Sequence, residues 1–425
     1  MSKEKKSSRS YRLKENKRKT SIISSIGLIF ILGIMINYFN KNCIYNDKIA
    51  KNIYIENVDV SNMTKEEAIK VVDENISPRD INLLYEDKSY KISPNDIDLT
   101  YDTKNVIDKA YNYTKTDSYI ENIKRYLSLR KDKKEFNINS NYNEAKLSEK
   151  IQNISKDINV DMINAKVYIS NYGGISTSPS TIGKELDIAN TKDVILNNIK
   201  NKNYSDINLK INIKKPHVKT EDAKSVNTLL GEFTTKFSTS LTGRVQNIRV
   251  AGNKSSDVLL MPGEEYSYNE YTGVRNKANG YKDAPVIING KLEDGLGGGV
   301  CQVSTTLYNA VLESGLKLIS ITNHSLLSTY VPIGRDAMVN DGGTDFRFKN
   351  QYNHPVYVKT VVGNGTLTCR IYGNDSDKKN IEIYVEAFKQ NGLDASKTYR
   401  KYKDSNGNVI DTEYIHKSVY KKPNK

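Results

Sequence analysis

The longest run of apolar residues lies near the N-terminus, where residues 21–39 (SIISSIGLIFILGIMINYF) carry no charged side chain. A helix of this length rises about 28 Å, which is close to the thickness of the hydrocarbon core of a bilayer. The run is longer than the apolar part of an ordinary signal peptide, and residues 40–43 after it do not form a small-residue cleavage site. The pattern therefore favours an uncleaved transmembrane helix over residues 21–40, with a cleaved signal peptide as the alternative.

Between residues 41 and 220 the apolar positions switch repeatedly between strand spacing and helix spacing. The segment NIYIENVDV alternates as a strand does, and helical spacing follows it, with Asn62 or Thr64 in position to cap the helix. Short strands around INLLYEDKSYKI and the helical segment DTKNVIDKAYNYT come next. From Lys134 a similar order of helices and strands returns. The pattern predicts an α+β region over residues 41–220, and the returning order would suit two similar halves.

A further helical pattern follows a run of glycines in GLGGGVCQVSTTLYNAVLESGL, residues 295–316. Apolar side chains recur at helical spacing from Val303 to Val311, which predicts an amphipathic helix that begins near Cys301 or Gln302. Gly315 is in position to end this helix, because glycine adopts the left-handed conformation common at helix C-termini.

Two strand patterns complete the chain. In GTLTCRIYG, alternation places Cys369 on the same face as its apolar neighbours, which predicts a strand with a buried cysteine. The segment YRKYKDSNGNVIDTEYIHKSVY contains two alternating stretches around Asn406 and Gly407, which predicts a hairpin. The chain is therefore expected to be α+β, with a mixed domain over residues 221–375 and a C-terminal β-ribbon within 376–425.

Charge is concentrated at the N-terminus. The formal net charge is +14, and residues 1–20 hold nine Lys and Arg against two Glu, so half of the excess lies in this short tail. Basic residues before a membrane span keep that end in the cytoplasm and send the rest of the chain outward. We therefore expect a cytoplasmic tail over residues 1–20, extracytoplasmic main domains in a single-pass membrane protein, and no nucleic-acid partner.

Three cysteines in an exported chain of 425 residues are too few for a disulfide framework. Cys301 would lie in the first turn of the predicted helix, where free N–H groups and the positive end of the helix dipole lower a thiol pKa. The preceding glycines, Gly298 and Gly299, would allow close substrate approach and present N–H groups to an oxyanion. A nucleophilic Cys301 competes with two alternatives: a buried structural cysteine at a tight turn, and a less favoured disulfide to Cys369.

A thiolate nucleophile needs a group that exchanges its proton. The chain has four histidines, of which His324 follows the predicted helix and one strand-like segment, so we predict that it is the base. His354 lies in a turn that is typical of a structural residue. Asp336 is the predicted orienting acid, with Asp345 behind it. Exposed or capping roles remain alternatives for all of these groups.

Other polar residues near the helix are candidates for binding substrate. Arg275 and Arg335 could hold a substrate carboxylate as planar forks. Gln302, Ser304 and Thr305 join the two glycines as candidates for oxyanion or substrate contacts, and the hydroxyls could instead bond to the helix end. The chain shows no zinc-ligand spacing, phosphate loop or dinucleotide fingerprint, so neither a metal nor another cofactor is expected.

From Phe233 onward a series of motifs resembles the VanW domain family. They include RVQNI, MPGEEYSYN, GGGVCQVSTTLYNAVLESGL, NHS, YVPIGRDAMV and DFRFKN, and they occur in this order. Upstream, GKELDIANTKDVI and INIKKPHVKTEDA resemble the peptidoglycan-binding domain that is often found before VanW domains.

The resemblance implies a role in the cell envelope, with peptidoglycan stem peptides as partners. Relatives are implicated as L,D-transpeptidases of a type distinct from YkuD, whose S-H-G-C motif this chain lacks. By resemblance, Cys301 would attack the carbonyl of meso-diaminopimelate, the third residue of a donor stem, and form a thioester. An acceptor amine would then produce a 3–3 cross-link. The alternatives are a non-catalytic wall-binding or glycopeptide-resistance accessory protein, and an L,D-carboxypeptidase that uses the same cysteine.

Overall fold

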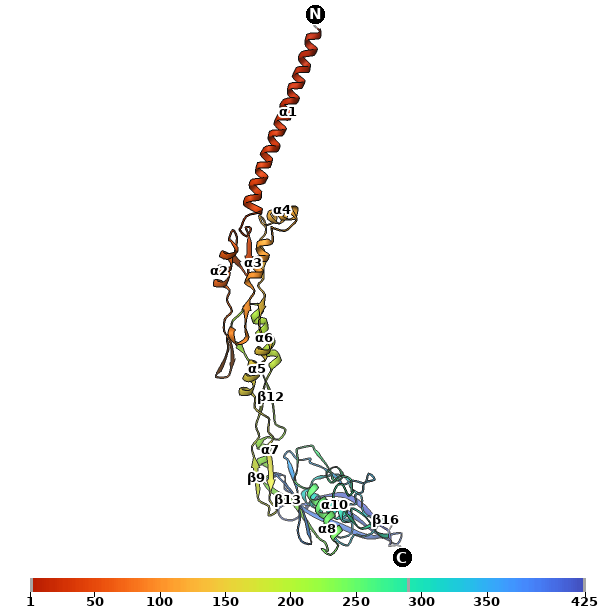
Figure 1. Ribbon diagram of the computed structural model, residues 1–425. Helices are drawn as coiled ribbons and strands as arrows, with labels where there is room; N and C mark the ends of the chain where they lie inside the picture. Colours follow the sequence, from red (N-terminus) through yellow and green to blue (C-terminus); the bar gives the residue numbers. More distant parts are fainter. Residues whose placement is uncertain (1–2, 289–290, 423–425) are drawn as a thin grey trace. The chain divides into compact units, whose positions relative to one another are not determined.

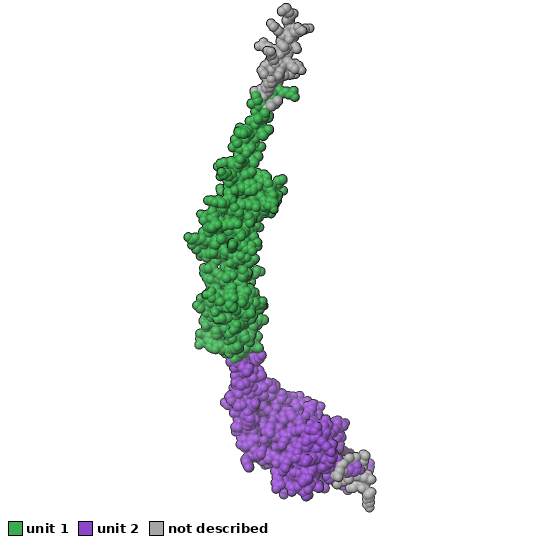
Figure 2. All heavy atoms as spheres, in the orientation of Figure 1, with its two compact units in different colours: residues 1–159, 184–212 green, residues 160–183, 213–425 purple. Residues whose placement is uncertain are grey.

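The computed structural model describes residues 3–288 and 291–422, and the chain divides into two compact units (Figure 2). The first unit comprises Met1–Asn159 and Lys184–Asn212, and the second comprises Val160–Gly183 and Ile213–Lys425. This division differs from the sequence-based boundary at residue 220, because a segment in the middle of the chain packs with the C-terminal unit.

The apolar N-terminal segment is helical, as predicted. Helix α1 (Lys3–Phe39) also takes in the basic tail, and a short π-helical turn, η1 (Asn40–Ile44), follows it. By length and composition, the part from Ile23 to Ile44 could cross a membrane, and its large apolar side chains from Ile23 to Ile36 are exposed. The structure therefore provides a helix of the kind that an anchor requires.

The first half of unit 1 is a small sheet covered by helices (Figure 1). Its strand order is β2-β1-β6, and the strands are β1 (Ile53–Ile55), β2 (Val58–Asp59) and β6 (Lys134–Phe136). Its helices are α2 (Lys65–Asn75), α3 (Thr103–Asn112) and α4 (Tyr119–Ser128). Thr64 caps α2 as predicted, because its hydroxyl accepts from the Glu67 N–H and its own N–H donates to the Glu67 carboxylate.

The second half of unit 1 repeats this arrangement with its own apolar core. Strands β3 (Ile81–Tyr85), β4 (Lys88–Ile92) and β11 (Ile207–Asn208) form a sheet in the order β11-β3-β4. Helices α5 (Glu144–Ile158) and α6 (Ile188–Lys200) pack against it. The remaining elements are η2 (Pro94–Ile97), β5 (Thr100–Tyr101), β7 (Ser140–Asn141), β10 (Gly183–Leu186) and β12 (Ile211–Lys214).

The core of unit 2 is a four-stranded antiparallel sheet in the order β13-β21-β20-β14. The strands are β13 (Thr228–Lys236), β14 (Val258–Leu260), β20 (Val356–Val362) and β21 (Thr366–Gly373). Cys369 lies on β21, is fully buried and is not in a disulfide, which confirms the strand and the buried cysteine expected from alternation. Helices α8 (Thr242–Lys254) and α10 (Val300–Ser314) pack on this sheet (Figure 1).

Helix α10 ends at Gly315 in the left-handed conformation, as predicted. The predicted amphipathic character is wrong, because 13 of its 15 residues are buried. Its polar residues form a buried face instead of a solvent-facing one. Thr306 bonds to Thr235 of β13, and Asn309 donates to the carbonyl of Arg335. Buried polar groups are tolerated where they find such partners, so α10 is the central helix of this unit.

Smaller elements surround this core. Strands β15 (Glu265–Ser267), β18 (Lys317–Ser320) and β19 (Arg347–Lys349) form one sheet, and helix α9 (Tyr268–Thr272) follows β15. Strands β16 (Asp283–Ile288) and β17 (Lys291–Leu296) form a hairpin. Hairpin β8 (Lys166–Ile169) and β9 (Ile175–Ser178) belongs to unit 2 because its apolar side chains pack with α7 (Thr220–Ser225) and with Tyr357 and Tyr372.

The C-terminal extension is a three-stranded antiparallel sheet. It contains β22 (Asn380–Gln390), β23 (Leu393–Lys403) and β24 (Val409–Tyr420), and it follows the short 3-10 turn η3 (Asp375–Asp377). The hairpin predicted around Asn406 and Gly407 is confirmed as β23 and β24, whereas β22 adds a strand that the sequence analysis did not assign.

Candidate active site

Cys301 is the second residue of α10 and lies two residues after a turn of three glycines. Gly297 and Gly299 have φ angles of 88° and 103°, a region that side-chain-bearing residues rarely adopt. Gly298 is required for a different reason, because a Cβ there would lie 2.5 Å from the carbonyl oxygen of Pro285. The glycines therefore hold the chain in a compact turn that delivers Cys301 to the helix N-terminus.

The turn leaves backbone donors near the thiol. Its internal hydrogen bonds use the N–H of Val300, which donates to Gly297, and the N–H of Gln302, which donates to Gly299. Neither bond uses the N–H of Gly299 or Cys301. At a helix N-terminus the first N–H groups have no partner within the helix, so these two groups suit the stabilisation of an oxyanion.

The Cys301 thiol contacts two groups from a different part of the chain. Its Sγ donates to the carbonyl oxygen of Val339 at 3.3 Å, and the side chain of His324 lies close enough to interact with it electrostatically. Burial by itself raises the pKa of the thiol, but the interaction with His324 and its positive charge outweighs it and holds the pKa below its ordinary value. The thiolate is therefore favoured at this position.

His324 lies in the loop after β18 and bridges Cys301 to a carboxylate. Its Nδ1 is 2.7 Å from Oδ2 of Asp336, and its backbone N–H donates to the same oxygen at 2.6 Å. Burial lowers the pKa of His324, whereas the interactions with Asp336 and Cys301 raise it, and the net effect is a pKa of about 9. These shifts favour a thiolate–imidazolium pair between Cys301 and His324.

Asp336 is almost completely buried, with 1% of its surface exposed. Burial raises the pKa of its carboxyl group, but hydrogen bonds from His324 and Tyr420 bring the pKa below its ordinary value. Tyr420 Oη donates to Oδ1 at 2.5 Å and accepts from the N–H of Gly334 at 2.9 Å. A buried, ionised carboxylate with these donors keeps the imidazole of His324 in one orientation.

Tyr420 is the last residue of β24, so the C-terminal sheet takes part in forming the site. The next residue, Lys421, donates its N–H to the carbonyl of Ser325 at 2.7 Å, beside His324. On β23, Thr398 donates to the carbonyl of Gly334 at 2.7 Å. The loops that carry His324 and Asp336 are thus held from outside by the terminal strands. Sequence reasoning missed Tyr420 because nothing near it in the chain indicates chemistry.

A cleft of about 540 Å³ opens at the N-terminal end of α10. Cys301 and His324 both line it, together with the glycine turn and β16–β17. The other polar or aromatic side chains on its wall are Arg244, Arg275, Gln302, Tyr330, Asn340 and Asp341. The cleft therefore brings together a thiol, an imidazole, backbone donors and cationic side chains in one solvent-accessible space.

Residues 243–372 match the family described as "VanW like protein". The chain contains a VanW-like domain. Cys301, His324 and Asp336 all fall within it, whereas Tyr420 lies beyond its matched end. Residues 90–208 match the family described as "Putative peptidoglycan binding domain". Both resemblances noted in the sequence are confirmed, and they support a role related to the cell wall.

Two curated proteins are similar to parts of this chain. Uncharacterized protein YoaR of Bacillus subtilis is 40% identical over 161 residues, which cover 38% of this chain and 53% of the relative. Vancomycin B-type resistance protein VanW of Enterococcus faecalis is 30% identical over 146 residues, which cover 33% of this chain and 52% of the relative. The chain thus spans about half the length of the curated relatives it matches. No solved structure matches it.

Within the VanW-like domain, the candidate residues of α10 are engaged with protein groups. The amide of Gln302 donates to Thr235 Oγ1 and to the carbonyl of Lys236, and its oxygen accepts from Arg244 at 2.7 Å. Ser304 donates to the carbonyl of Ala337 at 2.7 Å, and Thr305 accepts from its N–H at 3.0 Å. The two hydroxyls hold the Asp336 segment against the helix and are not on the cleft wall.

The two predicted carboxylate forks are already paired. Arg275 lines the cleft but binds Asp341 at 2.6 Å and Asn269 at 2.6 Å. Arg335 faces another direction, where it binds Asn309 and Glu313. Their charges are balanced by protein carboxylates, so neither guanidinium is free for a substrate in this conformation.

The remaining titratable candidates lie elsewhere. Asp345 accepts from the hydroxyl of Ser267 and from the N–H of Asn269, which places it at the start of α9 and not behind Asp336. The other histidines pair with other groups: His217 with Glu264, His354 with Asp377 and His416 with Tyr308. Within residues 3–288 and 291–422, no cluster of three His, Cys, Asp or Glu side chains could hold a metal ion.

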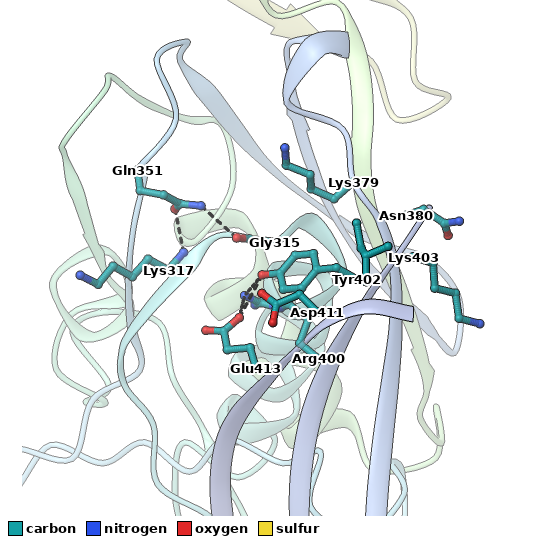
Figure 3. A pocket seen from close by; sticks show the side chains of 11 residues that line it. Gly315, Lys317, Gln351, Lys379, Asn380, Arg400, Tyr402, Lys403, Asp411 and Glu413 are labelled. Carbon is teal, nitrogen blue, oxygen red and sulfur yellow. Dashed lines mark hydrogen bonds and ion pairs between the residues drawn. The ribbon is translucent and has the colours of Figure 1, made fainter. Parts of the chain in front are cut away.

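A second cavity, of about 590 Å³, lies at the C-terminal end of α10 (Figure 3). Arg400 of β23, 1% exposed, pairs there with Glu413 and donates to the carbonyls of Val311 and Leu316. The last carbonyl groups of a helix have no hydrogen-bond donor within the helix. Arg400 supplies donors at this end of α10. The cysteine and histidine that the structure brings together, Cys301 and His324, line the other cleft.

Proposed function

We propose that this protein is a membrane-anchored peptidoglycan L,D-transpeptidase that acts through a thioester on Cys301. The observation that carries the proposal is the chain of contacts from the Cys301 thiol to His324, and from His324 to the buried carboxylate of Asp336, at the wall of an open cleft. A nucleophile, a proton carrier and an orienting acid in this order are what acyl transfer requires.

In the first step the Cys301 thiolate attacks the carbonyl carbon of the third residue in a donor stem. The carbonyl oxygen becomes an oxyanion, and the N–H groups of Gly299 and Cys301 are the donors in position to stabilise it. The bond to the terminal D-residue then breaks. The imidazolium of His324 gives its proton to the departing amine, and a thioester remains on Sγ.

In the second step an amine from a neighbouring stem attacks the thioester. His324, now neutral, takes a proton from this amine, the C–S bond breaks, and the thiolate–imidazolium pair is restored. A new amide joins the third residues of two stems. Asp336 stays ionised throughout, because its role is to hold His324 and to stabilise the imidazolium.

The surroundings of the VanW-like domain support a wall substrate. The matched peptidoglycan-binding region precedes it in the chain, and the apolar helix at the N-terminus is of a length that could anchor it. In the proposed topology the basic tail is cytoplasmic and both matched regions face the wall. A binding module on the same chain raises the local concentration of stems near Cys301.

The test uses the full-length protein in detergent micelles with disaccharide tetrapeptides. We expect an intact-mass increase equal to the disaccharide tripeptide acyl group, mapped to Cys301, followed by 3–3 cross-linked dimers. Cys301→Ala should abolish both, while Cys369→Ala serves as the matched control and should retain both.

Other products would redirect the assignment. Free tripeptide with no dimer would mean that water resolves the thioester, as in an L,D-carboxypeptidase. Binding to purified cell walls with no adduct, unchanged in Cys301→Ala, would contradict enzymatic function and indicate an accessory protein.

A further inference from the structure

Arg244 is a cation in the cleft whose hydrogen-bond partner is a neutral amide, and no carboxylate within residues 3–288 and 291–422 pairs with it. It lies in the first turn of α8, lines the same cleft as Cys301, and donates from Nη2 to the side-chain oxygen of Gln302 at 2.7 Å. The phenol of Tyr330, which burial keeps neutral by raising its pKa, is also on the cleft wall.

The position of Arg244 relative to Cys301 is fixed by backbone and side-chain contacts. A Cβ on Gly299 would lie 2.9 Å from Cγ of Arg244, so the arginine side chain runs directly along the glycine turn. Gln302, which receives its hydrogen bond, is 1% exposed and is itself bonded to β13. Arg244 is therefore held at the turn that carries the nucleophile.

Arg244 differs from Arg275 and Arg335 in the kind of group that pairs with it. Arg275 and Arg335 each have a carboxylate within 3.0 Å, whereas Arg244 is partly buried with a neutral amide as its partner. Burial lowers the pKa of Arg244, which means that the charged form loses hydration that the protein does not replace. A buried charge without a counter-ion is costly unless a ligand supplies one.

We propose that Arg244 binds a carboxylate of the donor stem and thereby selects the substrate. This inference rests on the proposed function and extends it to recognition. The free edge of the guanidinium would take the carboxylate through charge-assisted hydrogen bonds, and the Gln302 contact would keep the group oriented.

Two carboxylates of a donor stem lie close to the attacked carbonyl. One ends the departing D-residue, three bonds from the carbonyl carbon. The other ends the side chain of the diamino acid at the third position. Both would present the same chemistry to Arg244, so the experiment has one arm for each.

The experiment measures the rate at which full-length protein in detergent micelles forms the Cys301 adduct with three donors. The first donor has both carboxylates, the second carries an amide at its C-terminus, and the third carries an amide on the third-residue side chain. For the wild type we expect kcat/KM to fall on the order of 10- to 100-fold for the donor whose contacted carboxylate is amidated.

Arg244→Gln should lose the same factor of kcat/KM with the unmodified donor, and its Cys301 should react equally fast with that donor and with the amidated donor that the wild type discriminates against. Arg244→Lys, which keeps the charge but not the fork, should retain part of the preference. Arg347→Gln, at an arginine paired with Glu265 outside the cleft, is the matched control and should keep the wild-type preference. Thermal unfolding of each variant separates misfolding from lost recognition.

The outcomes are distinguishable. Equal rates of Cys301 acylation by all three donors in the wild type, or a preference that survives in Arg244→Gln, would overturn the carboxylate role and leave the transpeptidase proposal intact. Absence of an adduct with every donor would overturn the proposed function, and this inference with it.

Discussion

The hydroxyl of Tyr420 donates to the carboxylate of Asp336 at 2.5 Å, across 84 residues of sequence. Tyr420 lies on the last strand, β24, beyond the matched end of the VanW-like domain at residue 372. Since Asp336 in turn holds His324, the terminal sheet supports the candidate active site directly. The sheet is therefore part of the candidate active site, although it lies outside the matched domain.

This relationship predicts a role for Tyr420 as a positioning residue. Tyr420→Phe keeps the ring and removes the donor, so Asp336 loses one of the bonds that fix its carboxylate. We expect kcat for thioester formation to fall about 10-fold, which corresponds to about 1.4 kcal/mol, with little change in KM.

The matched control is Tyr414→Phe on the same strand, where the side chain is 54% exposed. It should leave both kinetic constants unchanged. A Tyr420→Phe protein that is as active as Tyr414→Phe would show that the hydrogen bond does not contribute to catalysis.

The two cysteines of the VanW-like domain should differ sharply in reactivity. The pKa of Cys301 is lowered by His324, whereas burial raises the pKa of Cys369 to about 12. Because the thiolate is the reactive form, iodoacetamide at pH 7 should alkylate Cys301 and spare Cys369 in the folded protein.

Peptide mapping after a brief exposure measures this difference. His324→Ala should slow the alkylation of Cys301 at pH 7, because the thiol pKa returns toward or above its ordinary value. Equal labelling of Cys301 in both proteins would contradict the thiolate–imidazolium pair.

The parts of the site that depend on local sequence were predictable. The glycine turn, the start of α10 near Cys301 and its end at Gly315 follow from neighbouring residues, and the structure has them. The burial of 13 of the 15 residues of α10 was not predictable, because its Ser, Thr and Asn side chains look solvent-facing until distant segments supply their partners. The same reason explains why Arg275 looked free: Asp341, which neutralises it, is 66 residues away.

Arg244 and Tyr420 also could not be identified as site residues from the sequence. Neither has a neighbour in the sequence that indicates chemistry, and both acquire a role only when strands and loops far along the chain come together. A pattern can locate a nucleophile at a helix N-terminus, but the groups that orient it are assigned by tertiary contacts.

The pH dependence of acylation should reflect the pair of Cys301 and His324. The pair exists above the lowered pKa of the thiol and below the raised pKa of the imidazole, which is about 9. We therefore expect kcat/KM to form a plateau through neutral pH and to fall as the pH rises through about 9, when His324 loses the proton that the departing amine needs. The acid limb and the alkaline limb of this pH profile both reflect the coupled titration of Cys301 and His324, and neither reports the pKa of one residue alone.

His324→Asn tests this assignment, because it keeps a polar side chain that does not titrate. The variant should be slow at all pH values and should lack the alkaline limb. A wild-type profile whose alkaline limb persists unchanged in His324→Asn would remove His324 from the proton transfer.

Gly298 should be the glycine of the turn that tolerates substitution least for steric reasons alone. A Cβ there would lie 2.5 Å from the carbonyl oxygen of Pro285 and 2.9 Å from that of Ala284, both of which are backbone atoms that cannot rotate away. Gly298→Ala must therefore displace the turn or β16, which moves the N–H groups of Gly299 and Cys301. We expect acylation to fall more than 10-fold and the free energy of unfolding to fall by about 1–3 kcal/mol. The control is Gly342→Ala, where the nearest atom is the end of the Asn340 side chain at 3.3 Å, and its unfolding free energy should change by less than about 0.5 kcal/mol. Chemical denaturation and adduct kinetics on both variants measure the two effects, and a Gly298→Ala protein with wild-type kinetics would mean that the turn does not position the oxyanion donors.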